Sequence, residues 1–241
     1  MGSGELEMKA FIFDVDGTLT PSRRPIDETF QRWFLEFCYS HHVYLVTGSD
    51  YPKTVEQLGS SICQNVVRVY NCNGNDVWEK GNNIYTNNWT LPEDAHEWLS
   101  EQLAESKLPL RTGLHFEHRP GMVNFSVVGR NATLGERMFY IKWDNEVDER
   151  NKIAAGFNNR FPNLQATVGG DTGLDIAPRG FDKSQILKDF EFDNVRLFFY
   201  GDRMDPAGND YTLSKLILDN RLGECYHICN WNETWNRLKT I

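Results

Sequence analysis

An acidic turn directly after a short apolar run most constrains how this 241-residue chain can fold. The apolar residues 10–13 suit a buried strand, and Asp14-Val15-Asp16-Gly17-Thr18 follows them. Because Gly17 favours a turn, both carboxylates are expected at the carboxyl end of that strand. One carboxylate and one backbone carbonyl could hold Mg²⁺, which would leave the second carboxylate to transfer protons. The alternative is a metal-free acidic turn, because Asp-Gly is common in turns.

Apolar runs and helical periodicities alternate in the first and last thirds of the chain. The expected strands cover residues 9–14, 43–47, 66–69, 195–200 and 225–229, and the expected helices cover 25–40, 51–58, 183–190, 210–220 and 233–239. Such alternation predicts a parallel sheet with helices on both faces.

The middle third has a different pattern. Residues 71–88 are rich in Asn and Gly, which favours turns and a hairpin. Helices are expected at 93–105 and 135–161, with strands at 114–117, 122–128, 165–168 and 174–177. We therefore predict an α/β fold: a doubly wound parallel-sheet core from residues 1–82 and 179–241, with an inserted α+β cap at 83–178.

The net charge and the cysteines limit which partners and which cellular compartment are expected. The net charge of −9 argues against nucleic acid, whose phosphates need a basic surface. No apolar run approaches the ~20 residues that a membrane-spanning helix needs, and the acidic start lacks the order of a signal peptide. An odd number of cysteines, five, suits free thiols. We expect a cytoplasmic protein without membrane partners.

Polar residues also lie at the ends of other expected strands and at the starts of expected helices. The loop Thr47-Gly48-Ser49-Asp50 could bind a phosphoryl oxygen, or simply cap a helix. Lys183 is placed at a helix start, where it opposes the helix dipole, so a purely structural role is less favoured. Asp202 lies just after the expected strand at 195–200, and Asp210 follows in the next loop. Ligands of open parallel sheets bind beyond the carboxyl ends of the strands, so one shared site is expected.

These motifs resemble the four motifs of the haloacid dehalogenase superfamily. The resemblance implies that Asp14 is a nucleophile that accepts a phosphoryl group, a role known for carboxylates. It implies that Lys183 offsets negative charge, that Asp202 binds metal, and that Thr47 or Ser49 contacts the phosphoryl group.

A closer resemblance, to the eukaryotic-type phosphomannomutase family, extends over essentially the whole chain. It is carried by residues 14–26 (DVDGTLTPSRRPI), 48–59 (GSDYPKTVEQLG), 116–130 (FEHRPGMVNFSVVGR), 169–183 (GGDTGLDIAPRGFDK) and 201–210 (GDRMDPAGND). It implies interconversion of mannose 6-phosphate and mannose 1-phosphate, with Mg²⁺ and a hexose 1,6-bisphosphate activator. It also implies a small sugar phosphate as the substrate, and we expect a homodimer through the cap.

The same resemblance assigns roles to individual residues. Asp14, Asp16 and Lys183 would be catalytic, with Asp16 the general acid and base. The metal site would comprise Asp14, Asp16, Asp202 and Asp210. The substrate would contact Arg23, Thr47, Ser49, Arg119, Met122, Asn124, Arg130, Arg137 and Asp175. Arginine forks suit bidentate phosphate recognition.

Three departures from the family pattern affect the substrate more than the Asp14 chemistry. Gly173 replaces a serine, Arg203 begins a segment where the family more often has Lys-Thr, and Thr212 replaces an acidic residue. A sugar-phosphate phosphatase on the same scaffold is the nearest alternative, because it shares every core motif. A non-catalytic sugar-phosphate binding protein is a more distant one, since binding alone needs no nucleophile.

Overall fold

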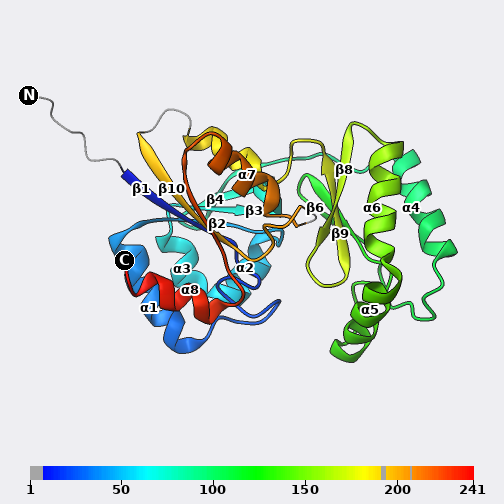
Figure 1. Cartoon of the computed structure of the whole chain (residues 1–241), viewed down its shortest axis with the longest axis horizontal. Coiled ribbons are helices and arrows are strands. Elements are labelled where there is room, and N and C mark those ends of the chain that lie inside the picture. Colours follow the sequence, from blue (N-terminus) through cyan, green and yellow to red (C-terminus); the bar gives the residue numbers. More distant parts are fainter. Residues whose placement is uncertain (1–7, 191–193, 207) are drawn as a thin grey trace, which may run out of the picture.

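The computed structural model describes residues 8–190, 194–206 and 208–241 and divides them between two β-sheets. Figure 1 shows two lobes side by side, with the first strand, β1 (Met8–Phe13), and the C-terminus in the same lobe. The first seven residues, on which the expectation about a signal peptide rests, lie outside the described residues.

The larger sheet has seven strands in the order β11-β10-β1-β2-β3-β4-β5. Its strands are β1 (Met8–Phe13), β2 (His42–Val46), β3 (Arg68–Asn71), β4 (Asp76–Glu79), β5 (Asn82–Thr86), β10 (Val195–Gly201) and β11 (Gly223–His227). β11 through β3 run parallel, whereas β4 and β5 add an antiparallel hairpin at one edge. The predicted parallel α/β core is confirmed.

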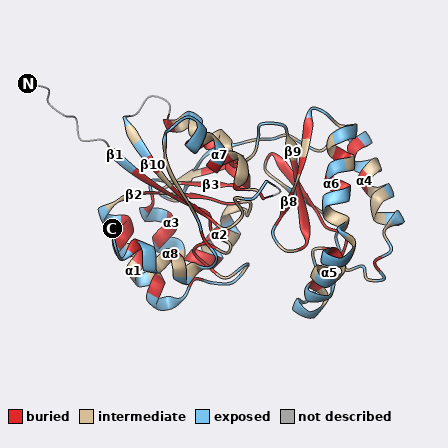
Figure 2. Ribbon diagram, in the orientation of Figure 1, coloured by how far each residue is buried: buried red, intermediate tan, exposed pale blue. Residues whose placement is uncertain are grey.

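Helices cover both faces of this sheet, as the strand–helix alternation requires. The helices of this lobe are α1 (Glu28–Ser40), α2 (Tyr51–Leu58), α3 (Ser60–Asn65), the 3₁₀ helices η1 (Cys72–Gly74) and η2 (Lys183–Phe190), α7 (Tyr211–Asp219) and α8 (Trp231–Leu238). Phe11 and Phe13 of β1 pack in one core with residues of α1, α3 and α8. The alternate residues Ala10 and Ile12 pack with η2 and α7 on the other face. Figure 2 shows the central strands of this sheet coloured largely as buried.

The smaller sheet is antiparallel, in the order β6-β7-β9-β8. It contains β6 (Phe116–Arg119), β7 (Met122–Phe125), β8 (Leu164–Gly169) and β9 (Gly173–Pro178), and its helices are α4 (Glu93–Glu105), α5 (Leu134–Val147) and α6 (Glu149–Arg160). A separate apolar core, with Leu99, Phe125 and Phe157 fully or almost fully buried, joins the helices to the sheet. The smaller sheet thus has an apolar core separate from those on the two faces of the larger sheet.

The first predicted boundary needs correction. A division between residues 82 and 83 would cut β5, which is hydrogen-bonded to β4 in the larger sheet. The sequence analysis expected turns and a hairpin at 71–88 but placed the boundary inside this segment. We propose that the cap begins after Thr86 and ends near Pro178.

The predicted helix at 135–161 is two helices. Asp148 adopts a left-handed conformation, with φ of 56°, and separates α5 from α6. That conformation is uncommon outside glycine, although Asp and Asn tolerate it better than most residues. None of the helices in the described ranges is both long and apolar enough to cross a membrane.

Candidate active site

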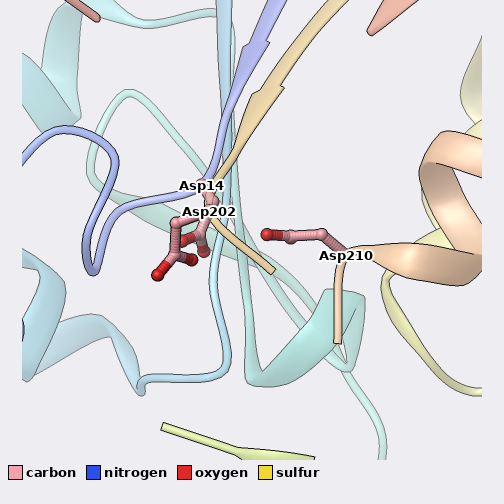
Figure 3. Close-up of side chains that lie close together, drawn as sticks. All are labelled: Asp14, Asp202 and Asp210. Atoms are coloured by element: carbon pink, nitrogen blue, oxygen red, sulfur yellow. The ribbon is translucent and has the colours of Figure 1, made fainter. Parts of the chain in front are cut away.

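Three carboxylates from distant segments gather at the carboxyl end of the larger sheet. Asp14 follows β1, Asp202 follows β10, and Asp210 immediately precedes α7. Each offers an oxygen within 4.8 Å of the others. Figure 3 shows Asp14 and Asp202 together at the ends of neighbouring strands, with Asp210 directed toward them.

Lys183 supplies one positive charge to this cluster from the start of η2. Its side chain is fully buried, and Nζ donates to Asp14 Oδ1 at 2.5 Å and to Asp210 Oδ1 at 2.8 Å. Burial alone would lower the pKa of Lys183, but the two carboxylates outweigh that effect and raise it. The lysine is therefore charged and fixed between two carboxylates.

The remaining negative charge makes the cluster suitable for a divalent cation. Burial raises the pKa of Asp14, and Lys183 offsets this only in part. Burial and the neighbouring Asp210 raise the pKa of Asp202 to about 7. Three carboxylates with a single ammonium group repel one another, and carboxylate oxygens are the donors that Mg²⁺ prefers. These residues fit a magnesium ion.

Gly17 allows the close approach of Asp14 and Asp202. Its φ of 81° favours glycine, and a Cβ there would lie 2.3 Å from Asp202 Oδ2. The glycine is therefore required both by the turn and by the carboxylate beside it.

The Asp16 carboxylate lies outside the three-carboxylate cluster. Its Oδ1 accepts the backbone N–H of Arg23 at 2.5 Å and the Gln57 side-chain amide at 2.9 Å. Among the described residues, no bond to Oδ2 is found. Arg23 itself has φ of 58°, so its N–H reaches Asp16 from a left-handed turn. These bonds fix the Asp16 carboxylate at the cavity wall.

The loop after β2 contributes Thr47 and Ser49 to the same cavity. Thr47 Oγ1 accepts the N–H of Ser49, so the two predicted contacts belong to one turn. The carbonyl oxygen of Gly48 accepts a bond from Arg119 Nη1 at 2.6 Å, which ties this core loop to the cap. Both hydroxyl residues remain candidates for the phosphoryl contact.

Five arginines line the cavity: Arg203 of the core and the four predicted from the sequence, Arg23, Arg119, Arg130 and Arg137, of which the last three belong to the cap. Arg119 and Arg130 share the carboxylate of Glu117, one oxygen each. Burial and the neighbouring Arg23 and Arg119 lower the pKa of Arg130 to about 10. Burial lowers the pKa of Arg23 as well, and Arg137 and Arg119 add to the effect. Such mutual repulsion favours an anion between these side chains.

The predicted sugar-pocket residues separate into two groups. Asn124 and Asp175 line the cavity and are joined by a bond of 2.7 Å from Asn124 Nδ2 to Asp175 Oδ1. Gly173 makes room for this pair, because a Cβ there would lie 2.7 Å from the Asn124 amide. Met122, in contrast, is 1% exposed and lies beside Asn73, whose amide is 3.8 Å from its sulfur, rather than in the cavity lining.

Core and cap therefore enclose one cavity of about 110 Å³ that contains both kinds of charge. The acidic cluster contributes Asp14 and Asp202 to its wall, and the arginines provide cationic donors. Lys183 lies behind Asp14, outside the lining. A nucleophilic carboxylate, a magnesium-binding cluster and anion-binding arginines in one cavity suit phosphoryl transfer.

Four residues to which the sequence analysis gave no role also belong to this site. Gln57 orients Asp16, Glu117 pairs two arginines, and Asp171 and Arg203 line the cavity. Glu117 lies within the segment 116–130 that carries the family resemblance, so its position could have been noticed. Gln57 likewise lies within the segment 48–59 of that resemblance, but its place in a helix gave no sign that it reaches Asp16 through the fold.

Comparisons with known proteins agree with this geometry. The sequence profile of the family "Eukaryotic phosphomannomutase" matches residues 31–241. A phosphomannomutase of Saccharomyces cerevisiae is 33% identical over 220 residues, which cover 87% of this chain and 85% of the yeast protein.

Solved structures share the fold at much lower identity. An IMP-nucleotidase of Plasmodium falciparum aligns with a TM-score of 0.66 at 14% identity, covering 97% of this chain and 70% of that one. A haloacid dehalogenase-like hydrolase from Bacteroides thetaiotaomicron aligns with a TM-score of 0.57 at 13% identity, covering 97% and 99%. At such identities the likeness shows the fold alone.

Proposed function

The chain belongs to the eukaryotic phosphomannomutase family, and on that premise we propose that it interconverts mannose 6-phosphate and mannose 1-phosphate. The reaction passes through a phosphorylated Asp14 and a hexose 1,6-bisphosphate, which also serves as the activator. The observation that carries the proposal is the single cavity lined by Asp14 and by the four predicted arginines.

Asp14 acts as the nucleophile. Its carboxylate attacks the phosphorus of the bisphosphate, an O–P bond forms to Asp14, and the bond from phosphorus to the sugar oxygen breaks. The position of Asp14 supports this role, since it ends a rigid central strand and is held by Lys183. In the second half of the reaction the phosphoryl group returns to the other end of the sugar.

Asp16 acts as the general acid and then the general base. It gives a proton to the leaving sugar oxygen and later takes one from the attacking hydroxyl. Its two bonds to Oδ1 support this assignment, because they fix the carboxylate while leaving Oδ2 without a bond from the described residues.

Asp14, Asp202 and Asp210 would hold Mg²⁺, and Asp16 would contribute its backbone carbonyl rather than its bonded carboxylate. The bound ion supplies charge neutralisation for the transferring phosphoryl group. Lys183 adds a fixed positive charge behind Asp14, and Thr47 or Ser49 donates to a phosphoryl oxygen.

The four arginines hold the phosphate that is not reacting. Because either phosphate of the bisphosphate must take that place in turn, the intermediate has to rotate within the cavity without leaving it. Asn124 and Asp175 would contact the sugar between the two phosphates. Contacts between cap and core, such as Arg119 with Gly48, would exclude water that could otherwise attack the phosphorylated Asp14.

One assay tests the proposal. The protein is incubated with mannose 1-phosphate and Mg²⁺, with and without a hexose 1,6-bisphosphate, and mannose 6-phosphate and free phosphate are both measured. We expect mannose 6-phosphate as the main product, formed faster with bisphosphate, and no product from Asp14→Asn. Free phosphate as the main product would instead identify a phosphatase.

We also propose that the protein is a homodimer joined through the cap. Leu134, Met138 and Phe139 of α5 are about half or more exposed, and this spacing places apolar side chains on neighbouring positions of one helix. A second copy would cover them. Sedimentation of the wild type and of Met138→Lys tests this, because the variant should shift toward the monomer.

We propose a cytoplasmic location because of the state of the cysteines. All five are free, and three of them are buried. Thiols of this kind suit a reducing compartment. Fluorescence microscopy of the tagged chain tests the assignment.

A further inference from the structure

One carboxylate in the arginine-lined cavity has no part in the proposed reaction. Asp171 lies in the turn between β8, which ends at Gly169, and β9, which begins at Gly173. It is a cavity-lining residue, and its side chain is 41% exposed. A negative charge at this place opposes the binding of a phosphate.

The turn that carries Asp171 is held in place on both sides. Arg150 Nη1 donates to the Gly170 carbonyl at 3.0 Å, while Arg150 Nε donates to Asp144. On the other side, the buried Ser126 hydroxyl donates to the Thr172 carbonyl at 2.9 Å. The position of Asp171 is thus fixed by cap residues outside the reaction.

Asp171 contacts one arginine and one residue of the core. Its Oδ2 lies 3.6 Å from Arg137 Nη2, and it accepts a bond of 3.2 Å from the Ser22 hydroxyl. Arg137 is 8% exposed, and its Nη1 has no hydrogen-bond partner among the described residues. A buried guanidinium therefore has one unpaired nitrogen and one distant counter-ion.

Arg137 differs in this respect from the other two cap arginines. Arg119 and Arg130 each make a direct hydrogen bond to one oxygen of Glu117, so each has a counter-ion in contact with it. The Arg137–Asp171 separation exceeds the usual hydrogen-bond distance, and the carboxylate is partly solvated. A phosphate could offer Arg137 shorter, charge-assisted bonds in exchange.

We propose that Asp171 limits the affinity of the cavity for phosphate by acting as a displaceable counter-anion: it balances Arg137 in the empty cavity and yields to a substrate phosphate. The inference rests on the proposed function for the identity of the substrate, but Asp171 would compete with any phosphate for Arg137. Ser22 keeps the displaced carboxylate near the cavity rim by its bond from the core.

Competition between Asp171 and phosphate for Arg137 weakens every complex in which a phosphate lies against the arginines. Because it acts on bound substrate, intermediate and product alike, it raises KM without favouring the transition state. It also speeds release of the product. Asp171 thereby limits how tightly four arginines can hold a phosphate that has to leave after each turnover.

Asp171→Asn tests the proposal, because it keeps the size of the side chain and an acceptor for Ser22 while removing the charge. Isothermal titration with inorganic phosphate on the full chain is the first measurement. We expect the Kd for phosphate to fall roughly three- to tenfold, the range for removing one partly solvated charge near a dianion. In turnover, KM for the sugar phosphate should fall by a similar factor and kcat should not rise.

Two matched variants separate the charge from its hydrogen bond. Ser22→Ala removes the bond but keeps the charge, and should leave the Kd for phosphate within about twofold of the wild type. Asp171→Glu keeps the charge, and its Kd for phosphate should stay near the wild-type value. An unchanged or higher Kd in Asp171→Asn, or equal effects of Asp171→Asn and Ser22→Ala, would overturn the proposal.

The titration also separates this inference from the proposed function. If the chain proves to be a phosphatase, Asp171→Asn must still bind inorganic phosphate more tightly. If it isomerises mannose phosphates but Asp171→Asn binds phosphate no better, the mutase assignment stands and the counter-anion role is wrong.

Discussion

Lys183 links the chemistry of the site to its stability. It is fully buried and bonded to both Asp14 and Asp210, so its charge is satisfied only when these three segments come together. Removing one partner of a buried ion pair is costly when the other charge is left unpaired. Here a second carboxylate remains whichever of the two is removed.

Asp14→Asn is therefore expected to stop turnover without unfolding the protein. The amide cannot accept the phosphoryl group, whereas Lys183 keeps its bond to Asp210 and one source of repulsion with Asp202 disappears. The isomerisation rate and the thermal unfolding curve of the same preparation provide the check. A residual rate of even a hundredth of wild type would contradict the assigned nucleophile.

The pH dependence of magnesium binding should report Asp202. Its pKa is raised in the folded protein to about 7, so its contribution to stability is present at acid pH and is lost as the pH rises through 7. Mg²⁺ competes with that proton and binds the ionised form. The rise in Tm caused by Mg²⁺ over EDTA should grow from pH 5 to pH 8.

Asp202→Asn provides the control for this measurement. Without the Asp202 carboxylate, the Mg²⁺-dependent rise in Tm should be much smaller than in the wild type throughout this pH range. A wild-type rise that shrinks toward pH 8 would contradict the placement of the cation at this cluster.

At the scale of helices and strands, the sequence patterns predicted where each element lies more accurately than the residues at which it begins and ends. The helix at 93–105 matches α4, because its amphipathic pattern is bounded by Pro92 and by loop residues. The predicted strand at 122–128 is shorter, since β7 ends at Phe125 and the chain then turns. Local pattern identifies an apolar face, but hydrogen-bond partners set the length of a strand.

The break at Asp148 and the edge hairpin show why the rest was not predictable. Asp148 has ordinary helical neighbours, so nothing local signals its left-handed backbone. The β4–β5 hairpin joins the larger sheet through pairing with β3, a contact that composition cannot reveal. Both features are decided by tertiary packing.

The N-terminal cap of α1 offers a test at this scale. The Asp27 side chain accepts the N–H groups of Thr29 and Phe30, and α1 covers one face of the core. Asp27→Ala should lower the free energy of unfolding by about 1 kcal/mol, measured by urea denaturation, with isomerisation unchanged. Asp27→Asn retains an acceptor and should lose less than half as much; equal losses would argue against capping.

On the scale of the whole molecule, the cap places arginines over a nucleophile that belongs to the core. The strand-end residues Asp14, Asp202 and Thr47 were predictable as a group, because parallel strands share one edge. The pairing of Arg119 and Arg130 through Glu117 was not, because it depends on how the chain after β7 folds back beside β6.

Arg130→Ala should separate two activities of the one protein. Loss of an arginine–phosphate bond should weaken sugar-phosphate binding about tenfold or more, so isomerisation of mannose 1-phosphate should collapse. Hydrolysis of p-nitrophenyl phosphate needs only the core residues and should persist. Both rates are measured on one preparation, with the exposed Arg237→Ala as control. Parallel loss of both activities would remove the main support for the mutase.

The order of the strands also has a consequence for the newly made chain. β1 pairs with β2 on one side and with β10 on the other, yet β10 begins only at Val195, after the whole cap. At about 5–20 residues per second, the ribosome takes roughly 10–40 s to proceed from Phe13 to Val195. Throughout that interval the apolar β1 has an unpaired edge, which is open to pairing with other chains. Nascent chains should therefore depend on chaperones until the last third emerges.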